Sequence, residues 1–101
     1  DQARRDGTTP LLIASQWGHA DVVQLLCDAG ADRDRARQDG ASPLLAACGM
    51  GHLEVARQLC GAGADKDRAV DSGATPLNIA CQTGRLEVVR LLCKAGADKE
   101  K

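Results

Sequence analysis

The sequence contains no Tyr, no Phe and a single Trp, so aromatic side chains cannot form the core of the fold. Burial of apolar surface must rely on Leu, Val, Ile, Ala and Cys, which suits thin packed layers better than one large core. No apolar run approaches the roughly 20 residues of a membrane span, and no charged-then-apolar leader opens the sequence. We therefore expect one folded domain of 101 residues that does not bind a membrane.

An excess of charge of either sign is also missing, since the sequence has 13 Lys and Arg residues and 14 Asp and Glu residues, a net charge of −1. The basic residues do not cluster, so nothing in the sequence predicts binding to nucleic acid or to an anionic membrane surface. We expect the partner to be a protein and not a polyanion.

Motifs for catalysis, cofactors or metals are absent as well. No C-x-x-C pair occurs, and His19 and His52 occupy equivalent positions without the three or four converging ligands of a zinc site. The glycines are widely spaced and do not form a phosphate-binding loop. Acidic and basic residues alternate around 32–39 and 65–71, which favours a solvated, self-compensating loop over an acid–base pair. We expect no catalytic residue, no cofactor, no metal and no enzyme activity.

The five cysteines recur at two structural positions. One position is occupied by Cys27, Cys60 and Cys93, and the other by Cys48 and Cys81. Equivalent atoms in stacked repeats should lie roughly 8–10 Å apart, which exceeds the Cα separation that a disulfide tolerates. Free thiols used as small hydrophobic side chains predict an intracellular, reducing compartment such as the cytoplasm.

A period of 33 residues runs through the whole sequence. Residues 6–38 and 39–71 are identical at 18 of 33 aligned positions without a gap, which excludes chance similarity. The same interval separates the members of each of these sets: Pro10, Pro43 and Pro76; Ala14, Ala47 and Ala80; Gly18, Gly51 and Gly84.

Each copy contains the signals for two short helices and a loop. Thr9 and Pro10 predict the start of the first helix, because the hydroxyl can cap free N–H groups and Pro is tolerated at the first position. Gly18 ends this helix, a second helix runs through 22–27, and Gly30 ends it in turn. Polar, turn-rich segments follow, with tips expected near Arg35–Asp39 and Arg68–Ser72 in the first two copies.

Neither helix is long enough to be stable alone, since isolated helices shorter than roughly 12–15 residues are marginal in water. Stacking of the copies is expected to bury Leu11, Leu12, Leu25 and Leu26, together with their equivalents. The prediction is an all-α solenoid of three antiparallel helix pairs. Its repeats span about 6–38, 39–71 and 72–101, and 1–5 align with the end of a preceding loop.

One copy carries the segments Gly-Ala-Thr-Pro-Leu at Gly73–Leu77, Gly-x-Leu-Glu-Val-Val-x-Leu-Leu at Gly84–Leu92, and Ala-Gly-Ala-Asp at Ala95–Asp98. This pattern resembles the ankyrin repeat, and the resemblance covers essentially the whole chain in three in-phase copies. The family usually has a hydrogen-bonding His after Thr-Pro-Leu. Here Leu12, Leu45 and Asn78 stand at that position, so only Asn78 could replace part of the usual polar network.

The resemblance implies a non-catalytic scaffold that binds a partner protein along a concave groove, formed by the loop tips and the exposed face of the first helices. Carried over by position, the candidate binding residues are Arg5, Asp6, Thr8, Gln16 and Trp17 in the first set, Gln38, Asp39, Ala41, Gly49 and Met50 in the second, and Asp71, Ser72, Ala74, Gln82 and Thr83 in the third. Trp17, Met50 and Thr83 form one column. Trp17 is either a binding hot spot there or a side chain packed on the adjoining repeat.

Two alternatives to partner recognition stay open. The chain could be a structural spacer, or an excised or minimal array without an independent function. Neither end repeat carries the polar outer face that is typical of a cap, so weak end-to-end self-association is also expected.

Overall fold

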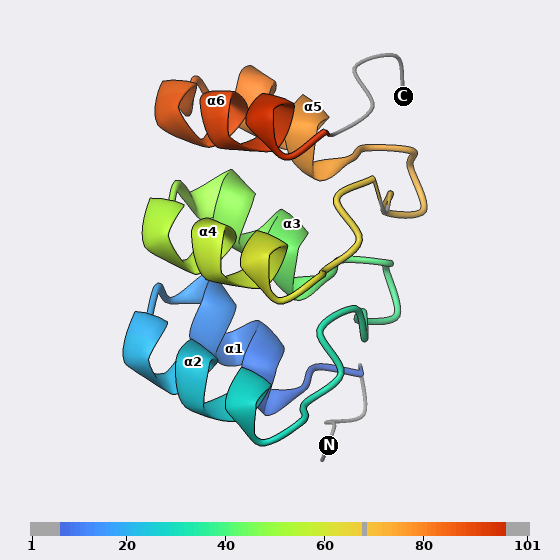
Figure 1. Cartoon of the computed structure of the whole chain (residues 1–101). Coiled ribbons are helices and arrows are strands. Elements are labelled where there is room, and N and C mark those ends of the chain that lie inside the picture. Colours follow the sequence, from blue (N-terminus) through green and yellow to red (C-terminus); the bar gives the residue numbers. More distant parts are fainter. Residues whose placement is uncertain (1–6, 68, 97–101) are drawn as a thin grey trace.

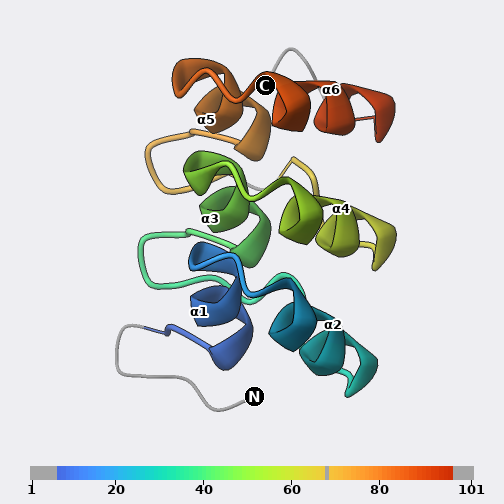
Figure 2. The same cartoon turned by 90° about the vertical axis from the view of Figure 1, so that its left-hand side faces the viewer.

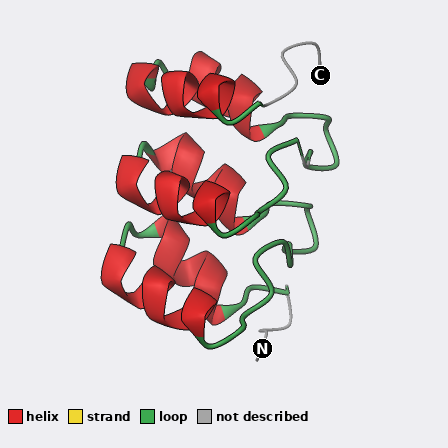
Figure 3. Cartoon of the chain, viewed as in Figure 1, coloured by secondary structure: helices red, strands yellow, loops and turns green. Residues whose placement is uncertain are grey.

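In the computed structural model, the described residues are 7–67 and 69–96, and within them the chain forms six helices and no strand (Figure 3). The helices are α1 (Pro10–Gln16), α2 (Ala20–Asp28), α3 (Pro43–Met50), α4 (Leu53–Gly61), α5 (Pro76–Gln82) and α6 (Leu86–Lys94). The expected pair of helices in each copy is confirmed, as is a loop after each of the first two pairs. The loop of the third copy, and Arg68 in the second expected tip, lie outside the described residues.

A hydroxyl side chain caps the start of each odd-numbered helix. Thr9 Oγ1 accepts a hydrogen bond from the backbone N–H of Leu12 at 3.2 Å, and Pro10 follows it at the first helical position. Ser42 and Thr75 make the same bond in α3 and α5. The cap satisfies one of the free N–H groups of the first turn, which fixes where these short helices begin.

Asn78 does supply a polar contact at the position where the family usually has His. Its Oδ1 accepts a hydrogen bond from the backbone N–H of Thr75 at 3.1 Å, while its own N–H donates to the Thr75 hydroxyl. The two bonds form a reciprocal capping box. Leu12 and Leu45 cannot make it, so α5 begins with a more complete cap than α1 or α3.

The helix pairs stack on one another in chain order (Figure 1). Figure 2 shows α1, α3 and α5 above one another in one column, with the outer helices α2, α4 and α6 on one side and the loops on the other. The extensive contacts between helix pairs all join sequence neighbours, as expected for a solenoid. None of the six helices in the described part of the chain has the length and apolar character of a membrane span.

The core runs through the stack between the two columns of helices. Leu11, Leu44 and Leu77 form one buried row, and Ala14, Ala47 and Ala80 form a second. Small side chains at the Ala positions allow α1, α3 and α5 to approach each other closely.

The prediction that Leu25 is buried is wrong, because 69% of its surface is exposed. Its equivalents in the next two copies, Gln58 and Leu91, line the clefts between α2 and α4 and between α4 and α6 respectively. This position therefore faces the preceding helix pair, and in α2 the described residues include no such pair. Leu26 is only partly buried, whereas Leu59 and Leu92 are fully buried.

The loops between helix pairs end in tight turns that stack on each other. The Arg37 N–H donates to the Ala41 carbonyl at 3.0 Å, and the Asp71 N–H of the next loop donates to the Asp39 carbonyl at 3.1 Å. Gly40 lies at this contact with φ +90°, and a Cβ atom there would lie 2.9 Å from Val70 Cα. The close approach of the two loops therefore depends on glycine at position 40.

We predict that Gly40→Ala destabilises the fold more than Gly73→Ala. Both residues have positive φ, but nothing lies within 4 Å of a Cβ atom at Gly73. Gly73→Ala should cost about 1–2 kcal/mol of unfolding free energy through backbone strain alone. Gly40→Ala should cost at least about 1 kcal/mol more, because the following loop must move. Urea denaturation measures both; equal losses would show that the loops are not in contact.

Candidate functional site

The surface formed by α1, α3, α5 and the adjacent loop tips is called here the inner face. The odd-numbered helices contact one another more extensively than the even-numbered helices do. Closer packing on one side of a stack bends the stack towards that side, so the inner face is the concave one. This is the surface on which the candidate residues were expected.

Trp17 and Met50 are the large apolar side chains exposed on the inner face. Trp17 directly follows α1 and is 62% exposed, and Met50 is the last residue of α3 and is 48% exposed. The two residues hold equivalent positions in their repeats. Adjacent packed helices are about 8–10 Å apart, so the two side chains are neighbours. Most of the Trp17 side chain is exposed, so packing on the adjoining repeat covers only the smaller part of it.

The third copy continues this column with polar side chains. Gln82 ends α5 and Thr83 follows it, and both are exposed. The Thr83 hydroxyl donates to the Ile79 carbonyl at 2.7 Å, so it is held against its own helix. The column therefore changes along the stack from an aromatic to an aliphatic to a polar side chain, so the two ends of the inner face differ in chemical character.

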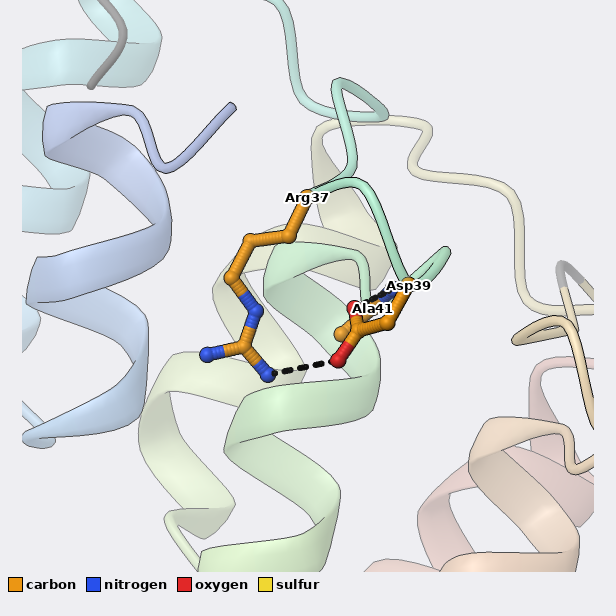
Figure 4. Close-up of polar contacts among 3 residues, drawn as sticks. All are labelled: Arg37, Asp39 and Ala41. Atoms are coloured by element: carbon orange, nitrogen blue, oxygen red, sulfur yellow. Dashed lines mark hydrogen bonds and ion pairs between the residues drawn. The ribbon is translucent and has the colours of Figure 1, made fainter. Parts of the chain in front are cut away.

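The loop tips lie at the other end of the odd-numbered helices. Gln38, Asp39, Asp71 and Ser72 are all exposed there. In Figure 4 the Asp39 carboxylate turns back into its own loop, where Oδ1 accepts from the Ala41 N–H at 2.9 Å and Oδ2 lies 3.4 Å from Arg37 Nη2. A seven-residue helix is about 10 Å long, so a partner that contacts both the tips and the Trp17 column must span about that distance.

Several expected binding residues are placed elsewhere. Thr8 is only 2% exposed and is packed inside the fold, so the expectation that it contributes to the surface is wrong. Its equivalent Ala41 is buried as well. Gln16 is half-buried. Arg5 and Asp6 lie outside the described residues.

Contacts between repeats involve residues that the sequence analysis did not assign to this role. His52 Nε2 lies 3.0 Å from the Gln16 carbonyl oxygen, so the ring N–H at that nitrogen donates across to the preceding repeat. Arg85, at the equivalent position, points its Nη2 at the Gly49 carbonyl at 3.5 Å. A Cβ atom at Gly18 would lie 2.6 Å from the His52 ring, so the ring packs directly against this glycine. The Gly-His pair that recurs at 18–19 and 51–52 is the sequence feature that could have predicted this contact.

The acidic residues of the loops also act between repeats. Asp34 Oδ1 accepts a hydrogen bond from the backbone N–H of Asp65 at 2.7 Å, across one repeat. Asp32 Oδ1 and Asp65 Oδ1 accept from the N–H groups of Asp34 and Asp67, two residues further along each loop. These carboxylates shape and connect the loops in addition to being solvated, and the prediction did not include that role.

Each of the five cysteines is free in the structure. Burial raises the pKa of the Cys48 thiol from 9.0 to about 12, and the nearby Cys60 adds to the increase. Burial also raises the pKa of Cys60 and of Cys27, although Lys66 and Arg33 respectively oppose the shift. Thiols with raised pKa values are poor nucleophiles and poor metal ligands, which fits their use as small apolar side chains. Within residues 7–67 and 69–96, no three His, Cys, Asp or Glu side chains are arranged to hold a metal ion.

The comparison with protein families agrees with this architecture. A family model described as "Ankyrin repeats (3 copies)" matches residues 1–69 and 29–101, so the chain belongs to the ankyrin-repeat family. Ankyrin repeats generally mediate protein–protein interaction and are typically non-catalytic. A search of curated proteins found no match to the chain.

We predict that His52→Ala lowers the unfolding free energy by about 1 kcal/mol, the net value of one hydrogen bond. His19→Ala is the matched control, because His19 holds the same repeat position but is exposed and should change stability by less than about 0.5 kcal/mol. Chemical denaturation of both variants tests this. Equal effects would show that the bond to the Gln16 carbonyl does not stabilise the stack.

Thiol reactivity should follow burial. At pH 8 and low protein concentration, Cys81 is exposed and should react first with an aromatic disulfide reagent, while buried Cys48 stays protonated and unreactive until the protein unfolds. Unfolding without reductant should then release a total of five reactive thiols. A total of three or one would reveal a disulfide and contradict the free-thiol assignment.

Proposed function

We propose that this chain is a non-catalytic recognition module, a single ankyrin-repeat domain that binds a partner protein on its inner face. The observation that carries the proposal is the exposed pair Trp17 and Met50 on the concave side of the stack. Large flat or flexible apolar side chains of this kind anchor protein interfaces. The tips at Gln38, Asp39, Asp71 and Ser72 would supply the polar rim.

The distribution of sequence differences among the copies supports recognition over the spacer alternative. Core positions such as Ala14, Ala47 and Ala80 are identical, because packing constrains them. The inner-face column instead reads Trp17, Met50 and Thr83. A spacer has no need of an exposed Trp, which leaves apolar surface in water without a stabilising contact.

We infer a reducing compartment from the cysteines. They recur at the repeat interval of 33 residues, and three of them have raised thiol pKa values because of burial. This pattern fits residues selected for packing and not for cross-linking.

The test uses three immobilised forms of the chain to capture proteins from the source cytosol. These are the wild type, Trp17→Ala, and Leu86→Ala as a control that removes an equally exposed apolar side chain away from the inner face. Because both side chains are exposed, each variant should change stability by no more than about 0.5 kcal/mol, checked by thermal melting.

We expect at least one protein to be retained by the wild type and by Leu86→Ala, but to bind Trp17→Ala at least about fivefold more weakly, the loss of an anchoring side chain. Binding that is equally strong to all three forms would contradict the assignment of the inner face. If the wild type retains no protein at a level above the blank matrix, the spacer alternative is favoured.

A further inference from the structure

The cleft between α4 and α6 lies among the outer helices and not on the inner face (Figure 2). Its lining residues are Leu53 and Arg57 of α4, and Glu87, Arg90, Leu91 and Lys94 of α6. Its volume is about 280 Å³, close to the lower limit of roughly 300 Å³ for small-molecule pockets. The cleft is therefore a second surface, whose size suits one or two side chains of a partner better than a cofactor.

Two leucines form the apolar floor of this cleft. Leu53 and Leu91 both pack against the hydrophobic core, yet each is only half-buried. Part of their apolar surface therefore remains in contact with water between the two helices. An aliphatic side chain inserted into the cleft would remove this surface from water, which is favourable.

Two arginines at equivalent repeat positions line the cleft with donors to spare. Arg57 Nη1 lies 2.8 Å from Glu54 Oε2, and Arg90 Nη1 lies 3.4 Å from Glu87 Oε1, in pairs along their own helices. Such exposed pairs are weak, and each uses one Nη1 of a guanidinium that has five N–H donors. Each arginine can therefore bind a second carboxylate without losing the first.

The position of these arginines is at the surface within the stack as well. With α6 packed beside α4, 55% of the Arg57 side chain is still exposed. The basic rim of the cleft is thus a property of the outer side of the helix pairs.

Lys94 adds a third positive charge to the rim. It lies in the last turn of α6, is exposed, and forms no ion pair within residues 7–67 and 69–96. Of the six lining residues, three are basic and only Glu87 is acidic. The local potential of the cleft therefore favours a negatively charged group, although the whole chain has a net charge of −1.

The equivalent cleft between α2 and α4 has a different chemistry. Gln24 and Gln58 line it at the positions that Arg57 and Leu91 hold in the other cleft. Its charged lining residues are one acid and one base, Asp28 and Arg33. Both clefts join the same helix positions, so stacking of the repeats does not require the leucine floor and the basic rim between α4 and α6.

We propose that the cleft between α4 and α6 binds an acidic segment of a partner protein that carries one aliphatic side chain. The aliphatic side chain packs on Leu53 and Leu91, and the flanking carboxylates pair with the three basic residues. A nucleic acid fits less well, because its closely spaced phosphates would meet Glu54 and Glu87 and would leave the leucine floor uncovered. This surface is independent of the inner face, so a partner can occupy both.

The test titrates a capped peptide, Glu-Asp-Leu-Asp-Glu, into the ¹⁵N-labelled chain at about 50 mM salt. The amide shifts should change in 53–57 and 87–94, with a dissociation constant on the order of 0.1–1 mM. Salt at about 0.5 M should weaken binding at least about fivefold, because it screens exposed charges. The peptide with Ala in place of Leu should bind at least about threefold more weakly, since it buries less apolar area.

Two variants test the rim and the floor separately. Lys94→Gln removes one positive charge from an exposed position, and Leu91→Gln introduces the residue type that the preceding repeat has at position 58. Each should weaken peptide binding about threefold. Arg33→Gln is the matched control, because it makes the same change in net charge in the cleft between α2 and α4, and it should bind the peptide like the wild type.

Four outcomes would overturn the proposal. The first is the absence of shift changes at about 5 mM peptide, or shift changes centred on the inner face. The second is equal affinity for the Leu and Ala peptides. The third is an equal loss of binding in Arg33→Gln and Lys94→Gln, which would indicate attraction by net charge alone. The fourth is tighter binding of tripolyphosphate than of the peptide, which would indicate a phosphate site.

Discussion

Burial of apolar side chains between neighbouring helix pairs is the interaction on which the rest of this structure depends. The helices have only seven to nine residues each, too few to persist in water without a packing partner. A helix pair alone leaves a wide apolar side uncovered, and only the next pair in the stack covers it. The N-terminal caps and the glycine turns set the length and direction of each helix, but contact with the neighbouring pair stabilises its folded state.

This dependence explains why equivalent residues differ so much in their surroundings. Cys48 and Cys81 hold the same place in their repeats, yet the first is buried with a pKa near 12 and the second is exposed. Polar contacts between repeats follow the same logic: His52 reaches the Gln16 carbonyl, while His19 at the equivalent position is exposed. The environment of a side chain in this fold is therefore decided by its place in the repeat and by the presence of a neighbour on the side that it faces.

The sequence predicted the helix starts at Pro10, Pro43 and Pro76 and the end of the first helix at Gly18, which has positive φ in the structure, because these signals are local to each copy. It failed at Leu25, since apolar character shows that a residue can be buried but not which side of the stack it faces. It also failed at Thr8, where the family position was taken to be exposed but the side chain is buried. The contacts of His52 and Asp34 connect different repeats, so no local pattern could specify their partners.

Because the framework residues are needed for stacking, residues on the inner face, where recognition is proposed, are freer to vary between copies. Contacts between repeats, in contrast, supply the stability of each helix pair. Native-state hydrogen exchange of a dilute, monomeric sample measures this helix by helix. We predict the slowest amide exchange in α3 and α4, which have a neighbour on both sides, and faster exchange in α1, α2, α5 and α6. Exchange in α3 and α4 as fast as in the outer pairs would contradict the account.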